Sequence, residues 1–186
     1  MPNRAFIGIG TNLGDRAANY REALQRIAAL PDTRVVRQSS VYETEPVGDL
    51  KGPFLNLAVE VETEMFADAM MRRLLVIERV MGRKRTKARK TTRRGSGYQP
   101  RTIDLDLLFF NKEVLDTPAL TIPHPRLHER RFVLAPMVEL APMLIHPKTN
   151  KTISEMLVEL KSAHRVSLAR AELLRPQAAK REVSLR

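Results

Sequence analysis

FLNLAVEVET, residues 54–63, alternates with a period of two over its whole length. Successive side chains of a β-strand point to opposite faces of a sheet, so alternate residues share a face. We therefore expect a long strand with one apolar face that is turned towards a core. That face carries Leu55, Leu57, Val59 and Val61, and the opposite face carries Phe54, Asn56, Ala58, Glu60 and Glu62.

Two strands and a helix are expected before this stretch. RAFIGIG (4–10) and TRVVRQSSVYE (33–43) have the composition of strands, and the turn-prone GTNLGD follows the first of them. Asp15 is placed to cap a helix that lies between the two strands. The expected apolar face of this helix consists of Tyr20, Leu24, Ile27 and Ala28. The loop TEPVGDLKGP (44–53) then leads into the long strand.

A second helix and a last strand are expected after the long strand. FADAMMRRLLVIERVMG (66–82) has helical periodicity and ends in the helix stop Gly82. Its expected apolar face consists of Phe66, Met70, Leu74, Ile77 and Met81. A basic loop (83–100) precedes the strand TIDLDLLFF (102–110). The order β-α-β-β-α-β predicts an α+β protein of ferredoxin-like fold, with a mostly antiparallel sheet and two helices on one face.

The rest of the chain predicts additional C-terminal helices. Asn111 and Lys112 can turn a hairpin into residues 113–115, and helices are expected over 132–140 and 153–160. Residues 165–186 have mixed charge and weak periodicity. We therefore expect a single domain over 1–164 and a loosely attached tail over 165–186.

The charge of the chain indicates a polyanionic partner. The formal net charge is +11 over 186 residues, and RKRTKARKTTRR (83–94) holds eight basic residues and no acid. Nucleic acid or a small molecule with several phosphates would fit, and a solvated surface loop is the alternative. The chain has no cysteine, no apolar run long enough for a membrane span and no signal-peptide pattern at its start. These features predict a cytoplasmic protein.

Asp104 and Asp106 stand one residue apart in PRTIDLDLLFF (100–110). On a strand they point the same way, with their anchor points about 7 Å apart, while Ile103, Leu105 and Leu107 point the other way. Two carboxylates at this distance repel by about 2 kcal/mol at an effective dielectric near 20. The pair is therefore either a solvated strand face or a site for a hard cation such as Mg²⁺.

The basic residues near this pair in the sequence suit a nucleoside triphosphate as ligand. Neither a P-loop nor a GxGxxG motif is present, so the phosphates would need side-chain cations and a metal held by carboxylates. Such cations are available at Arg83, Arg85 and Arg101. Phosphoryl-type transfer depends mainly on positioning and charge neutralisation, which a cluster of this kind supplies.

Aromatic and amide residues indicate a small flat substrate. Phe54 and Asn56 share one strand face, and Phe132 follows a basic pair. Each phenylalanine taken singly also fits a core position. His124 could donate to a phosphate or have a structural role. Its i, i+4 spacing to His128 resembles a zinc pair, but Pro125 argues against a helix that would hold both.

The motifs together resemble one family, the 6-hydroxymethyl-7,8-dihydropterin pyrophosphokinases of folate biosynthesis. The resemblance runs from Ile7 to about Pro147. It is carried, in this order, by GTNLGD, SSVYETEPVG, FLNLAVEVET, IERVMGRKR, PRTIDLDLLFF, TIPHPRLHERRFVLAPMVELAP and IHP. The resemblance implies transfer of the terminal diphosphate of ATP to the hydroxymethyl group of the dihydropterin, with release of AMP.

The resemblance also implies a role for each matching residue. Asp104 and Asp106 would hold two Mg²⁺ ions and, with the loop cations Arg83, Arg85 and Arg101, would be catalytic. ATP would be contacted by Glu78, Arg83, Arg85, Arg101, Leu107, Thr121, His124 and Arg130. The pterin would be contacted by Thr44, Glu45, Val47, Phe54, Asn56, Tyr98 and Phe132, and would lie flat between the two phenylalanines.

Departures from the family pattern occur in the basic loop, at Glu45, where many members have proline, and at Pro125, where tyrosine is often found. Two rival interpretations stay open. The loop is longer than is usual in the family, and Tyr98 stands near the place of a common tryptophan. The resemblance implies that this loop closes over the nucleotide. One rival is a nucleic-acid-binding module that uses residues 83–94, although Tyr98 is the only ring nearby and no RNP1 motif is present. The other is a different Asp-x-Asp nucleotide transferase, which would release ADP or pyrophosphate.

Overall fold

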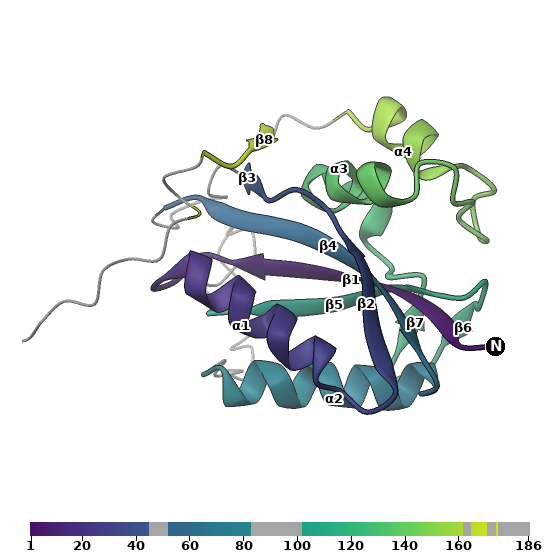
Figure 1. Cartoon of the computed structure of the whole chain (residues 1–186). Helices are drawn as coiled ribbons and strands as arrows, with labels where there is room; N and C mark the ends of the chain where they lie inside the picture. Colours follow the sequence, from purple (N-terminus) through teal and green to yellow (C-terminus); the bar gives the residue numbers. More distant parts are fainter. Residues whose placement is uncertain (45–51, 83–101, 162–164, 171–173, 175–186) are drawn as a thin grey trace, which may run out of the picture.

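In the computed structural model, residues 1–44, 52–82, 102–161, 165–170 and 174 are described. The elements within these ranges are β1 (Asn3–Thr11), α1 (Arg16–Ala28), β2 (Thr33–Gln38), β3 (Tyr42–Thr44), β4 (Phe54–Thr63), α2 (Ala67–Val80), β5 (Asp104–Phe110), β6 (Leu115–Asp116), β7 (Thr121–Ile122), the 3-10 helix η1 (Leu127–Glu129), α3 (Arg131–Leu140), α4 (Ile153–Glu159) and β8 (Val166–Leu168). The helices lie on both sides of one sheet, with α1 and α2 on one side and α3 on the other (Figure 1).

The sheet has the ferredoxin-like topology that the order of the elements predicts. Its strands run β5-β1-β4-β3-β8, and β2 pairs with β4 beside β3. Every pair among the described strands is antiparallel. Because β1 is antiparallel to both β4 and β5, the end of β1 meets the beginnings of β4 and β5 at one end of the sheet.

The prediction of a single strand over 33–43 is wrong, because the structure divides this segment into β2 and β3. The interruption falls at Ser39, whose backbone N–H donates to the Ala58 carbonyl at 3.0 Å. The Ser39 hydroxyl in turn accepts from the Ala58 N–H at 3.0 Å. A side-chain oxygen thus takes the place of a backbone carbonyl in the ladder, and the two halves pair with different parts of β4.

Helices α1 and α2 pack on the apolar face of the sheet, as expected. Asp15 caps α1 by accepting from the Ala18 N–H at 2.9 Å, an interaction of about 1 kcal/mol. The expected contact of Ala28 with the core is wrong, because Ala28 is exposed and Ala23 is buried instead. Phe66 is also exposed, at 76%, because α2 begins one residue later and leaves Phe66 at its N-cap.

The face of the sheet that is turned away from α1 and α2, here called the outer face, is covered over part of its length by α3 and α4. Phe6, Ala58 and Leu108 form a second apolar cluster with these helices. Glu60 is buried on the same face between the guanidinium groups of Arg4 and Arg37, each 2.5 Å from one of its oxygens. The strand β4 is therefore buried on both faces rather than on one.

The C-terminal segments differ from expectation in their pairing. Asn111 turns the chain after β5 with φ 50°, but β6 pairs with β7 and not with β5. The helices expected over 132–140 and 153–160 are confirmed as α3 and α4. Residues Val166–Leu168 pair with β3 as the edge strand β8, and the loose attachment of the remaining tail stays a prediction. No helix in the described ranges has the length and apolar character to cross a membrane.

Candidate active site

The two aspartates lie on the outer face, on β5. Asp104 is paired with Gly10 of β1 and Asp106 with Gly8. Both carboxylates are half-buried, whereas the intervening Leu105 is 1% exposed and belongs to the core beneath α1 and α2. The expectation that the aspartates share one face is therefore confirmed.

Asp106 lies beside two further residues of the expected site. Arg130, which precedes α3, places Nη1 3.3 Å from Asp106 Oδ2, and His124 places Nε2 3.8 Å from the same oxygen. His124 Nδ1 accepts from the Arg126 backbone N–H at 3.2 Å, so the proton of the neutral ring is on Nε2, facing the carboxylate. Burial lowers the pKa of His124 below 6.5. Of the neighbouring charges, that of Asp106 raises this pKa and that of Arg130 lowers it.

The donor set fits a magnesium ion that is shared with a bound ligand. Two carboxylates on one face provide oxygen donors, and Mg²⁺ commonly completes its shell with water and phosphate oxygens. Among the described residues, no three His, Cys, Asp or Glu side chains form a cluster that could hold a metal by themselves. The zinc pair suggested by the spacing of His124 and His128 is not supported in this part of the chain.

Three of the expected pterin residues, Thr44, Phe54 and Asn56, lie two or three strands away from the carboxylates. Asn56 is 6% exposed on β4 and donates from Nδ2 to the hydroxyl of Thr44 on β3 at 2.9 Å. Phe54 begins β4 and pairs with Thr44, so these three residues form one corner of the outer face. Phe132 lies in the first turn of α3, with the Arg130 guanidinium carbon 5.7 Å from its ring centre.

Three expected nucleotide residues have surroundings that the sequence did not reveal. Glu78 of α2 is 1% exposed and accepts from the Leu105 N–H at 2.9 Å, so it fastens the strand that carries the aspartates. Leu107 points into the core beneath α1 and α2, which leaves its backbone as the part nearest the site. The Thr121 hydroxyl donates to Asp116 at 3.2 Å.

Six expected site residues lie outside the described residues, and their roles stay predictions. They are Glu45, Val47, Arg83, Arg85, Tyr98 and Arg101.

Gly10 is a component of the site that the sequence analysis did not single out. It was expected as the last residue of the strand over 4–10 and the first of the turn-prone GTNLGD, whereas β1 continues to Thr11 and places Gly10 between Asn56 and Asp104. The signal was present in FIGIG, where glycines at alternate positions leave one strand face without side chains.

A second missed feature joins α3 to the strand that carries Thr44. The Glu139 carboxylate accepts from the backbone N–H of Ser40 at 3.0 Å and from its hydroxyl at 2.8 Å. It also accepts from the Tyr42 hydroxyl at 3.1 Å. These bonds tie the end of α3 to the start of β3, and thus connect the elements that carry Phe132 and Thr44.

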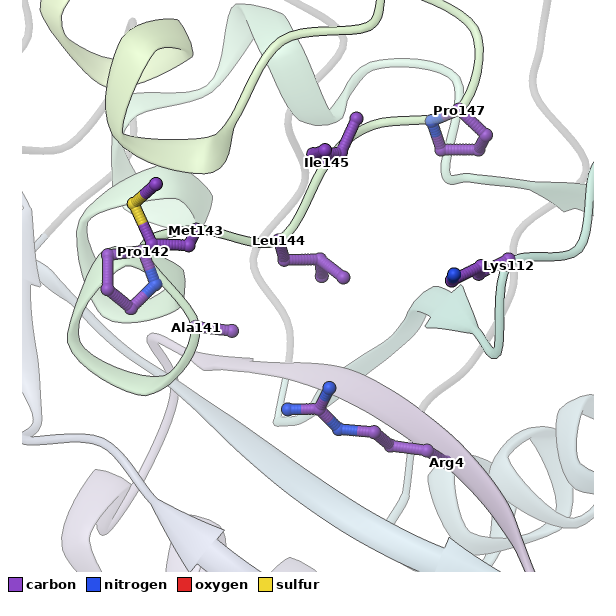
Figure 2. A pocket seen from close by; sticks show the side chains of 8 residues that line it. All are labelled: Arg4, Lys112, Ala141, Pro142, Met143, Leu144, Ile145 and Pro147. Carbon is purple, nitrogen blue, oxygen red and sulfur yellow. The ribbon is translucent and has the colours of Figure 1, made fainter.

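A hollow of about 570 Å³ lies elsewhere on the molecule (Figure 2). Arg4 and Lys112 face the apolar loop 141–147 across it. Arg4 is six residues from Gly10 along β1, which corresponds to about 20 Å at the rise of a strand. Because the guanidinium of Arg4 is paired with Glu60, and the carboxylates lie at the other end of β1, this hollow is separate from the candidate active site.

In this α+β fold, carboxylates and cations share one face of an antiparallel sheet, an arrangement suited to a transferase that acts on phosphates. Residues 6–142 match the family described as 7,8-dihydro-6-hydroxymethylpterin-pyrophosphokinase (HPPK). The chain is also 41% identical to 2-amino-4-hydroxy-6-hydroxymethyldihydropteridine pyrophosphokinase of Bacillus subtilis, over 75% of this chain and 79% of the relative. The chain belongs to the 7,8-dihydro-6-hydroxymethylpterin-pyrophosphokinase family.

A further relative agrees with this assignment, and two solved structures have a similar fold. The Methylorubrum extorquens enzyme of the same name is 37% identical over 84% of this chain and 93% of its own length. The fold is similar to a crystal structure described as HPPK-DHPS in complex with substrates, with a TM-score of 0.64 and 16% identity. A Plasmodium falciparum HPPK-DHPS structure with pteroate gives a TM-score of 0.66 and 17% identity. The matches cover 85% and 86% of this chain but 43% and 42% of those longer chains.

Proposed function

We propose that this chain transfers the terminal diphosphate of ATP to the hydroxymethyl group of 6-hydroxymethyl-7,8-dihydropterin, and that it releases AMP as a step of folate biosynthesis. The observation that carries the proposal is the register Asn56–Gly10–Asp104 across β4, β1 and β5. Two strand spacings, about 9.5 Å, separate the backbone positions of Asn56 and Asp104. A flat ring at the amide would thus place its substituent beside the phosphates. The proposal keeps the cytoplasmic location expected from the sequence.

In the proposed complex, the carboxylates and cations of β5 and the segment before α3 hold the nucleotide. Asp104 and Asp106 would bind two Mg²⁺ ions, which supply positive charge to the phosphate oxygens of ATP. Arg130 and His124 stand beside Asp106 and would donate to the same phosphates. The proposal gives Thr121, Glu78, the Leu107 backbone and the loop cations Arg83, Arg85 and Arg101 their roles from the family resemblance.

The pterin would lie at the corner formed by β3, β4 and the start of α3. Phe54 and Phe132 would cover its two faces, and Asn56 would meet its polar edge. Because Asn56 Nδ2 already donates to Thr44, its Oδ1 is the atom turned towards a ligand, and it would accept from a ring N–H. Glu45, Val47 and Tyr98 complete this proposed pocket.

The reaction then depends mainly on orientation. The hydroxymethyl oxygen attacks the β-phosphorus, a new P–O bond forms, and the hydroxyl proton is released to solvent. The bond from the β-phosphorus to the α–β bridging oxygen breaks, so that AMP leaves with that oxygen. Arg130 and the protonated Nε2 of His124 are positioned to donate to oxygens on which negative charge accumulates. Holding both substrates on one rigid sheet face supplies the alignment that this in-line displacement needs.

The test is separation of the nucleotide products after incubation of the protein with Mg-ATP, with and without the dihydropterin. The proposal predicts AMP only when the pterin is present. ADP or pyrophosphate as the product would support another Asp-x-Asp transferase instead. Folded protein that yields no nucleotide product with the pterin, under conditions in which the Bacillus subtilis relative is active, would refute the proposal.

A further inference from the structure

Gly10 occupies the centre of the outer face, between the two halves of the proposed site. It pairs with Asn56 on one side and with Asp104 on the other. A Cβ atom built on Gly10 would lie 3.3 Å from Asn56 Oδ1 and 3.9 Å from the Asp104 Cβ. The first distance is tighter than ordinary van der Waals contact, so an added methyl group would have to displace the amide oxygen.

The Asn56 amide has little freedom to move away from such a methyl group. Asn56 is 6% exposed, and its Nδ2 is held by the Thr44 hydroxyl at 2.9 Å. Oδ1 is therefore the end of the amide that lies over Gly10. A shift of a few tenths of an ångström would stretch the bond to Thr44 or turn the acceptor away from the substrate.

We propose that Gly10 is a positioning residue that sets the place of the Asn56 acceptor and, through it, the affinity for the pterin. This inference rests on the pterin site of the proposed function. Gly10 would act through its lack of a side chain. Without a Cβ atom at this position, the Asn56 amide oxygen can lie close to the backbone of β1, between Asp104 and the corner formed by Thr44 and Phe54. Its substitution should weaken binding of the pterin and leave binding of the nucleotide unchanged.

Gly8 provides the matched control within the same strand. It also lies in β1 between β4 and β5, but the three atoms nearest to a Cβ built there all belong to the Leu108 side chain, at 3.4 Å or more. That contact is of ordinary length and belongs to the apolar cluster beneath α3. Neither glycine has a positive φ, so alanine is compatible with the backbone at both positions.

The experiment measures the dissociation constant of the pterin by calorimetry, in the presence of Mg²⁺ and a non-hydrolysable ATP analogue. Gly10→Ala should raise it by about 3- to 10-fold, the range expected for one impaired hydrogen bond. Gly8→Ala should leave it within about twofold of the wild type. The dissociation constant of the ATP analogue, measured separately, should be unchanged in both variants.

A double-mutant cycle identifies the contact responsible. In an Asn56→Ala background the oxygen that the methyl group would displace is absent, so adding Gly10→Ala should change pterin affinity by less than about twofold. Because the close contact is gone, this double variant also tests the inference if Gly10→Ala alone folds poorly.

Three results would overturn the inference: unchanged pterin affinity in Gly10→Ala, an equal loss in Gly8→Ala, or the same additional loss in the Asn56→Ala background. Wild-type protein that binds no pterin would instead overturn the proposed function, and the inference with it.

Discussion

Asp106→Asn replaces one member of the carboxylate pair by a side chain of the same shape. Two opposing effects on stability follow from the geometry. The change removes a repulsion from Asp104 of about 2 kcal/mol at 7 Å and an effective dielectric near 20. It also weakens the bond from Arg130 at 3.3 Å, of a kind that contributes about 1.5–3 kcal/mol. We therefore expect the free energy of unfolding to change by no more than about 1 kcal/mol.

The effect on turnover should be much larger than the effect on stability. Loss of one group that neutralises charge at a transition state typically lowers kcat by about 100- to 1000-fold, equivalent to about 2.7–4 kcal/mol. The assays are pterin-dependent AMP release and urea unfolding. Asp68→Asn on α2 is the matched control, because it makes the same change in an exposed ion pair with Arg72. Activity within about tenfold of wild type in Asp106→Asn would refute the role given to the pair, and so would a loss of activity explained entirely by unfolding.

Three further changes have expected outcomes. Phe54→Ala should weaken pterin binding by about 1–3 kcal/mol, the cost of losing one stacking face, and a larger effect on the ATP analogue would contradict the assignment of this corner. Glu60→Gln should lower the free energy of unfolding at pH 7 by about 1–2 kcal/mol, an amount reduced because the two arginines that share the carboxylate are half-exposed. Burial alone would raise the pKa of Glu60, but the two arginines hold it below 4.5. The stabilisation by the Glu60 carboxylate is therefore complete above pH 4.5 and is lost as the pH falls through the lowered pKa. A difference in the free energy of unfolding between Glu60→Gln and wild type that persists in acid would contradict this pH dependence. Thr152→Ala removes the capping box of α4 and should cost about 1 kcal/mol in urea unfolding, and an unchanged midpoint would count against it.

The parts of the fold that the sequence predicted are those that depend on local patterns. The strand over 54–63, which its period of two predicted, and the cap at Asp15 are features of short segments, and both are confirmed. The placement of Asp104 and Asp106 on one face follows from strand geometry alone. These local patterns also led to the correct order of the core elements, β-α-β-β-α-β. Each strand or helix with one apolar face must bury that face against another layer of secondary structure.

The parts that the sequence did not predict depend on contacts between distant segments. The division of residues 33–43 results from the exchange of bonds between Ser39 and Ala58, which lie on different strands. Burial of the outer face of β4 requires α3, which is more than 65 residues further along the chain. The position of Gly10 beneath the Asn56 amide likewise appears only when β1 and β4 are placed in register.

The proposed site is tested most directly by mapping where the pterin binds. Amide chemical shifts of isotope-labelled protein would be recorded as the dihydropterin is added in the presence of Mg²⁺ and a non-hydrolysable ATP analogue. The proposed pterin site predicts the largest changes at Gly10, Leu105 and the side-chain amide of Asn56, where β1, β4 and β5 meet. Largest changes at Lys112 and Leu144, around the separate hollow at the other end of β1, would contradict it.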